Sequence, residues 1–186
     1  YESWLDSIAD DRERRFAELN YGPWDALDDD KPFMKGFGPK PLGARFYPQD
    51  MSKTEFEEAY LPGKEGLYTF VRRDDEGRLV LVPYHVEYTE ELKAAASVLR
   101  QAAKLAKSPD FANYLKLRAA ALISDDFQLS DSYWMDVKDT EIDVVIGPIE
   151  TYLDRLYGYR TAYEAYVLIK DLEWSDRLSR FAAFLP

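Results

Sequence analysis

Two short stretches each place a glutamate and a tyrosine two positions apart within residues of high β-propensity: Glu150 with Tyr152, and Glu164 with Tyr166. In a strand, residues i and i+2 point to the same face, so each pair would present a carboxylate beside a phenol. A carboxylate on so apolar a strand is costly to bury unless a cation meets it, and a phenol can donate to a developing negative charge. On the pattern alone, a hairpin whose polar face is simply hydrated is favoured, and a recognition surface is the alternative.

The other polar clusters are better explained by local structure. His85 is the only histidine, so we expect it at a strand end, bonded to the backbone or to a carboxylate, rather than in a metal site. The Gly-rich stretch 35–40 lacks the flanking strand and helix of a phosphate-binding loop and is expected to be a turn. Three acidic clusters lack the spacing of a calcium-binding loop and are typical of turns and caps: 28–30, 74–76 and 125–126. No metal site is predicted in this chain.

Composition narrows the classes of function. The 186 residues are 46% hydrophobic and 15% aromatic, which is enough to bury the core of one domain. A net charge of -11 disfavours nucleic acid and anionic membranes as partners. No cysteine is present, which excludes disulfides and thiol catalysis and favours a reducing compartment, so we expect a cytoplasmic location.

The elements that must position these residues are mixed, and they predict an α+β fold of antiparallel hairpins with packed helices, in a single domain over residues 1–186. A proline-rich, aromatic-rich arm over 22–66 is expected to be irregular, with one short helix after Ser52. The predicted helices are 2–19, 89–107, 109–123, 130–137 and 173–184. The predicted strands are 67–73 paired with 78–86, and 142–152 paired with 162–170, both antiparallel.

One region carries a specific pattern. Residues 146–152 read Ile-Gly-Pro-Ile-Glu-Thr-Tyr, followed by Asp154, Gly158 and Arg160, and residues 163–167 then read Tyr-Glu-Ala-Tyr-Val. From residue 146 to 177 the chain resembles the dipeptidyl peptidase III family of zinc metallopeptidases. Two earlier stretches, 20–24 and 40–48, resemble a bacterial branch of that family. Pro148, Leu153 and Arg155 depart from the commoner pattern.

The resemblance implies a two-lobed hydrolase with a wide cleft. In that family zinc lies on a mostly helical lobe, held by His-Glu-x-x-x-His and a later Glu, and the other lobe contains a β-barrel and contacts substrate. This chain would be the N-terminal, β-barrel-containing lobe, with a partly closed β-barrel. By the same resemblance Glu150 would hold the free amine of the peptide and Tyr152 would be catalytic, hydrogen-bonding near the scissile carbonyl. Glu164 is a further substrate-binding candidate on the partner strand.

The chain contains no His-Glu-x-x-x-His, so the zinc is expected in a missing C-terminal lobe of the same polypeptide, and this fragment is expected to be inactive alone. The start at Tyr1 and the apolar end at residues 184–186 favour a piece of a longer protein. Its expected partners are a peptide substrate and that lobe. The alternatives are a free-standing, non-catalytic peptide- or protein-binding module and a small glycosidase using Glu150 and Glu164, which requires a particular carboxyl spacing.

Overall fold

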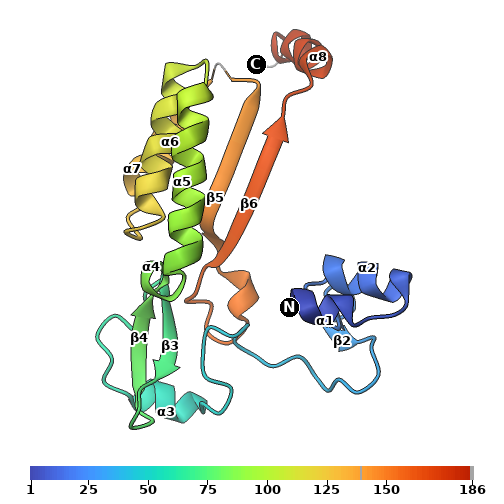
Figure 1. The fold of residues 1–186 in the computed structure, drawn as a ribbon, viewed down its shortest axis with the longest axis vertical. Helices are drawn as coiled ribbons and strands as arrows, with labels where there is room; N and C mark the ends of the chain where they lie inside the picture. The colour runs from blue at the N-terminus through green and yellow to red at the C-terminus, as the bar shows by residue number, and fades with distance from the viewer. Residues whose placement is uncertain (139, 185–186) are drawn as a thin grey trace. The chain divides into compact units, whose positions relative to one another are not determined.

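Helices and antiparallel strand pairs succeed one another in the computed structural model, which describes residues 1–138 and 140–184 (Figure 1). The α+β prediction is therefore confirmed. The chain divides into two units, Tyr1–Leu42 and the chain from Gly43 onward. In the part of the chain that the structure describes, no helix is both long enough and apolar enough to span a membrane.

The first unit contains helices α1 (Glu2–Asp6) and α2 (Asp11–Leu19) and the short strands β1 (Trp24–Asp25) and β2 (Lys31–Pro32), which pair antiparallel. The single helix predicted over 2–19 is wrong. Asp10 is the reason for the break, because its carboxylate accepts hydrogen bonds from the backbone N–H groups of Arg12 and Glu13 and so begins a second helix.

The second unit opens with helix α3 (Lys53–Glu58), whose N-terminus is capped by Ser52 as predicted. Strands β3 (Thr69–Arg73) and β4 (Leu79–Pro83) form the predicted hairpin. Residues 84–86, predicted to extend that hairpin, instead lie in a one-turn helix, α4 (Tyr84–Glu87). Burial explains the difference, because the ring of Tyr84 lies in the core and its hydroxyl donates to the Thr161 carbonyl at 2.7 Å.

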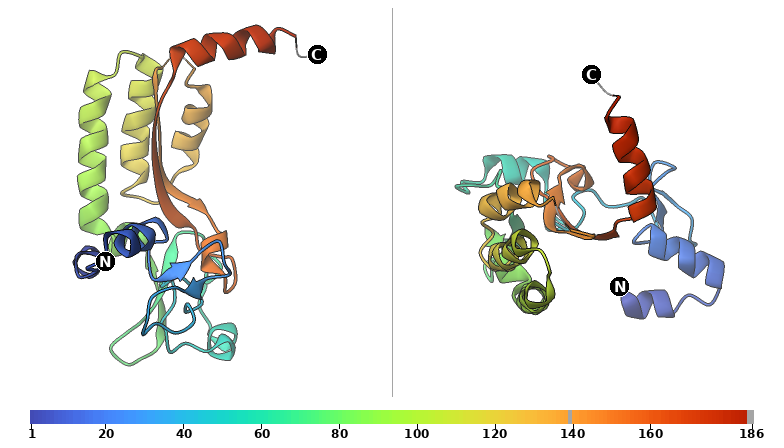
Figure 2. Two further views of the ribbon diagram at one scale, coloured as in Figure 1. Left: turned by 90° about the vertical axis from the view of Figure 1, so that its right-hand side faces the viewer. Right: turned by 90° about the horizontal axis from the view of Figure 1, so that it is seen from above.

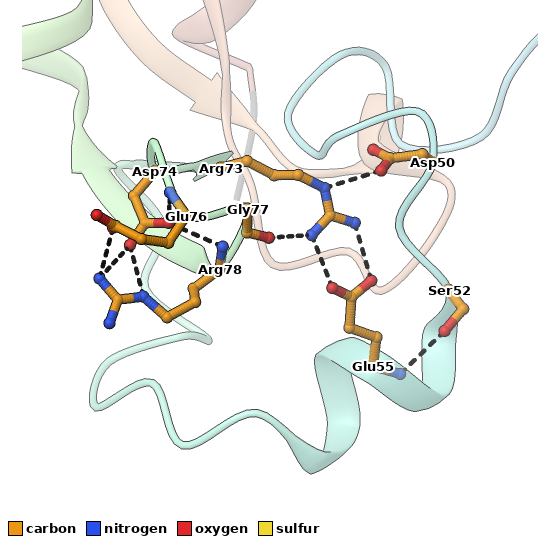
Figure 3. Close-up of polar contacts among 8 residues, drawn as sticks. All are labelled: Asp50, Ser52, Glu55, Arg73, Asp74, Glu76, Gly77 and Arg78. Atoms are coloured by element: carbon orange, nitrogen blue, oxygen red, sulfur yellow. Dashed lines mark hydrogen bonds and ion pairs between the residues drawn. The ribbon is translucent and has the colours of Figure 1, made fainter.

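Arg73 ties the tip of this hairpin to α3 (Figure 3). Its guanidinium donates two parallel hydrogen bonds to the Glu55 carboxylate, at 2.7 and 3.0 Å, and further bonds to Asp50 and to the Gly77 carbonyl. The hydrogen bond from Arg73 holds the pKa of Glu55 below its ordinary value. Bidentate pairing of this kind fixes geometry as well as charge, so the hairpin and α3 form one rigid corner.

Three helices and a long two-stranded ribbon make up the rest of the unit: α5 (Thr89–Leu105), α6 (Pro109–Ala121), α7 (Gln128–Asp136), β5 (Ile142–Glu150) and β6 (Ala162–Ile169). The helices stand along one side of the β5–β6 ribbon (Figures 1 and 2). Their core of Leu115, Leu122 and Phe127 also receives Val144 and Ile146 from β5. The helical hairpin therefore supports β5 along its length.

A 3-10 turn, η1 (Tyr152–Asp154), follows β5, and helix α8 (Leu172–Ala182) follows β6. In the described residues the strands form three separate two-stranded antiparallel sheets, β1–β2, β3–β4 and β5–β6. These sheets do not close, so the partly closed β-barrel is not confirmed.

Candidate functional site

The predicted antiparallel pairing of the two long strands is confirmed, and its register places the candidate residues. Glu164 lies opposite Gly147, Tyr166 lies opposite Val145, and Glu150 lies opposite Ala162 at the end of the ladder. Both glutamates therefore lie in the half of the ribbon that leads into η1.

The end of β5 differs from the prediction. Pro148 pairs with Tyr163 and Glu150 with Ala162, so Ile149 is an extra residue in a β-bulge. Thr151 then takes a helical conformation, with φ -96° and ψ -13°. The strand predicted to reach Tyr152 ends at Glu150, and the strand alternation that would put these two side chains on one face does not apply.

Glu150, Tyr152, Glu164 and Tyr166 nevertheless gather at this end. The Tyr166 hydroxyl donates to Glu164 Oε2 at 2.6 Å, and this hydrogen bond is the main reason that the pKa of Tyr166 is raised. Tyr152 and Glu150 contribute further to raising that pKa, so both lie within electrostatic reach of Tyr166. The two residues of the i, i+2 pattern on β6, Glu164 and Tyr166, are thus in direct contact.

The carboxylates of Glu150 and Glu164 differ in their exposure and in their hydrogen-bond partners. Glu164 is half-buried and engaged by Tyr166, whereas Glu150 is exposed and makes no hydrogen bond or ion pair with any described residue. Tyr152 is 61% exposed, with its phenol open to solvent. An unpaired carboxylate can bind a cation. A phenol nearby can donate a hydrogen bond to an oxygen.

Two buried residues, Asp154 at the end of η1 and Tyr47 in contact with it, had no role assigned from the sequence. Asp154 is fully buried, and the Tyr47 hydroxyl donates to it at 2.7 Å. An Asp shortly before a glycine, here Gly158, is typical of a turn whose N–H groups bond to the carboxylate, and this was the available signal. Tyr47 lies 107 positions away, and no local pattern connects it to the turn.

The remaining polar clusters are structural. His85 lies in α4 rather than at a strand end, and its Nδ1 lies 2.8 Å from the carboxylate of Asp125, so its partner is a carboxylate, one of the two kinds expected. Asp74 accepts the backbone N–H groups of the β3–β4 turn, as expected of a turn residue. Among residues 1–138 and 140–184, no group of three or more His, Cys, Asp or Glu side chains is arranged to hold a metal ion.

A pocket of about 670 Å³ lies at the far end of the β5–β6 ribbon, lined by residues that include Trp134, Asp143 and Leu168. The Ile142–Ile169 pair ends the ladder there, whereas Glu150 and Ala162 end it on the other side. The candidate residues therefore do not line this pocket.

No family model matches the chain. Two solved structures are similar to it over nearly its whole length. One is dipeptidyl peptidase III from Caldithrix abyssi, with 39% sequence identity and a TM-score of 0.86, and the other is dipeptidyl-peptidase III from Corallococcus sp. strain EGB, with 34% identity and a TM-score of 0.84. The resemblance to the dipeptidyl peptidase III family is confirmed. Each alignment covers 98% of this chain but only 36% of the dipeptidyl peptidase III structure, so the chain corresponds to about a third of those proteins.

A curated relative gives a second comparison. Nudix hydrolase 3 from Arabidopsis thaliana is 29% identical over 210 residues, which cover 84% of this chain and 27% of that protein. The chain therefore spans about a quarter of this relative and about a third of each dipeptidyl peptidase III.

Proposed function

We propose that this chain is the N-terminal, substrate-binding lobe of a zinc-dependent dipeptidyl peptidase III-like metallopeptidase, a peptide hydrolase. The observation that carries the proposal is the placement of Glu150, Tyr152 and Glu164 at the η1 end of the ribbon, in the segment whose sequence resembles that family. Residues 1–186 form a single lobe in this proposal, and the cleft lies between it and a second lobe of the same polypeptide.

Glu150 is the residue proposed to hold the amine of the peptide. A free N-terminus carries an ammonium group, and Glu150 makes no hydrogen bond or ion pair with any described residue that would compete for it. A hydrogen-bonded contact between charged groups contributes about 1.5–3 kcal/mol. Glu164 is the second substrate-binding residue, with its geometry fixed by the hydrogen bond from Tyr166.

Tyr152 is proposed to be catalytic. Its exposed phenol can donate to the oxygen of the scissile carbonyl, where negative charge develops during hydrolysis. Such a donor acts mainly in the transition state, because the bond strengthens as the charge develops.

The residues of this chain do not fit a zinc site. Zinc in peptidases takes nitrogen, sulfur and carboxylate ligands, and the one histidine here is already in contact with Asp125. The proposed zinc therefore belongs to the C-terminal lobe, and no catalytic step is assigned to a metal on this chain.

The C-terminal zinc lobe of the same polypeptide is the second proposed partner. Large apolar side chains lie exposed on the outer half of β6 and on α8, among them Ile169, Trp174 and Phe181 at 80%, 59% and 72% exposure. Helix α8 has no buried residue. An apolar surface of this kind is typical of a face that another part of a protein covers. A cytoplasmic location, supported by the absence of cysteine, completes the proposal.

The test uses the full-length polypeptide that the gene encodes. We expect it to release dipeptides from the N-terminus of short peptides, to lose this activity on chelation and to recover it with zinc. The 186-residue chain alone should bind no stoichiometric zinc and release nothing. Products other than dipeptides from the full-length polypeptide, or tight stoichiometric zinc on the fragment, would contradict the proposal. Peptide binding without any cleavage would favour the non-catalytic binding module instead.

A further inference from the structure

Asp154 organises the turn that follows β5. It is fully buried, and its Oδ1 accepts hydrogen bonds from the backbone N–H groups of Leu156 and Tyr157 at 2.9 and 3.0 Å. Its Oδ2 accepts from the N–H groups of Tyr159 and Arg160 at 3.1 and 3.2 Å. One carboxylate thus collects four donors of a single loop, and this fixes the path of the backbone from η1 to the start of β6.

Tyr47 connects this turn to a distant part of the second unit. It is 5% exposed, and its hydroxyl donates to Asp154 Oδ2 at 2.7 Å. The Gly43 N–H donates to the backbone carbonyl of Asp154 at 3.0 Å. The segment 43–47 therefore forms hydrogen bonds with both the side chain and the main chain of Asp154. The guanidinium of Arg160 lies over the Tyr47 ring, 5.3 Å from its centroid.

Arg160 connects the Asp154 turn to a second segment, residues 64–66. It is fully buried and donates to the carbonyls of Gly66 and Lys64 at 2.5 and 2.6 Å. The Asp154 turn is therefore anchored at two places remote in sequence, which leaves it little freedom to shift.

We propose that Asp154, held by Tyr47, is the positioning residue for Tyr152. Tyr152 begins the 3-10 turn η1 and Asp154 ends it, so the two residues belong to the same short turn. The side chain of Tyr152 is mostly exposed, so little packing holds it, and the backbone of the turn sets the point from which it extends. This inference rests on the proposed function of Tyr152.

Glu150 is held differently. It belongs to the β5–β6 ladder through its pairing with Ala162, which does not require Asp154. Loosening the turn should therefore affect turnover, through Tyr152, and leave amine binding by Glu150 almost intact. A purely structural role for Tyr47 would not produce this separation of kcat from KM.

The test is Tyr47→Phe in the full-length polypeptide, because it removes one hydroxyl and keeps the ring in the core. The matched control is Tyr114→Phe, which removes a buried tyrosine hydroxyl that donates to the Val144 carbonyl at 2.6 Å, away from η1. We expect Tyr47→Phe to lower kcat about ten- to a hundredfold with little change in KM, since small displacements of a reacting group cost this much. Tyr114→Phe should leave both constants near wild type.

A double-mutant cycle identifies the route of the effect. If Tyr47 acts through Tyr152, Tyr47→Phe should cost little further kcat in a Tyr152→Phe background. An unchanged kcat in Tyr47→Phe, or losses that multiply fully in the double variant, would overturn the inference.

A second readout separates this inference from the proposed function. Amide hydrogen exchange of Leu156, Tyr157 and Tyr159 should be faster in Tyr47→Phe than in Tyr114→Phe, and the ring signals of Tyr152 should move only in the former. If the wild type has no peptidase activity, the proposed function fails, and these signals alone decide the positioning claim. Unchanged exchange and unchanged Tyr152 signals in Tyr47→Phe would overturn it.

Discussion

The hydroxyl of Tyr166 donates a 2.6 Å hydrogen bond to Glu164, two positions before it on β6. One oxygen of this carboxylate is therefore already engaged. Glu150 makes no such bond in the part of the chain that the structure describes. The two glutamates of the site are consequently unequal, and Glu150 is the better acceptor for an incoming ammonium group.

This inequality predicts how two matched substitutions differ. Glu150→Gln should weaken binding of a free-amine peptide by about 1.5–3 kcal/mol, the value of a charged hydrogen bond. Glu164→Gln should cost less, because a glutamine oxygen still accepts from Tyr166. Titration calorimetry on the full-length polypeptide checks both, and a larger loss from Glu164→Gln would reverse the assignment.

Tyr152→Phe should lower turnover with little change in peptide affinity. If the phenol is a full donor to the oxyanion, the barrier rises by about 2–4 kcal/mol. Steady-state kinetics give kcat, and equilibrium binding of the peptide gives the affinity separately. A wild-type kcat in this variant would remove Tyr152 from the catalytic site.

Substitution of Gly147 by alanine should lower the stability of the fold, and the same substitution at Gly158 is the control. Its φ is +146°, and an added Cβ would lie 3.2 Å from Arg118 Nη1 and from a Phe127 ring carbon. Strain and overpacking together should make Gly147→Ala destabilising by about 3 kcal/mol. Gly158 also has a positive φ, +71°, but has nothing within 4 Å, so Gly158→Ala should cost only about 1 kcal/mol. Equal losses of unfolding free energy in urea would show that β5 does not pack closely on Arg118 and Phe127.

Asp154 should contribute to acid sensitivity. Burial alone would raise the pKa of this carboxyl, but the hydrogen bonds from Tyr47 and from the loop N–H groups outweigh it and lower the pKa. A lowered folded pKa stabilises the fold above the unfolded value of about 3.9 and loses this contribution as the pH falls through the folded value.

Urea unfolding between pH 7 and pH 3 measures this contribution. Asp154→Asn should cost roughly 1–3 kcal/mol at pH 7, and the difference from wild type should shrink on acidification below about pH 4. Asp126→Asn, at an exposed position, is the control and should change little at any pH. A difference for Asp154→Asn that stays constant down to pH 3 would contradict this account.

Local patterns were enough to predict the supporting elements. The β-branched and aromatic residues of 142–150 and 162–169, the Ser108-Pro109 cap and the acidic turn at 74–76 each carry a short-range signal. The helical hairpin and both long strand pairs follow from them.

The exact end of β5 could not be predicted in this way. Thr151 and Tyr152 have high β-propensity, yet they lie outside the strand, next to a turn in which Asp154 accepts the loop N–H groups. That carboxylate is in turn held by Tyr47, a contact 107 positions distant. The turn that carries Tyr152 therefore includes a long-range hydrogen bond that no local pattern predicts.

The central claim is that Glu150 holds the amine of the peptide, and the most direct measurement compares one short peptide with a free or an acetylated N-terminus. Both are titrated into the full-length wild type and into Glu150→Gln. The account predicts that the wild type binds the free-amine peptide about ten- to a hundredfold more tightly, that Glu150→Gln loses this preference, and that affinity for the acetylated peptide is unchanged. An undiminished preference for the free amine in Glu150→Gln would contradict the account.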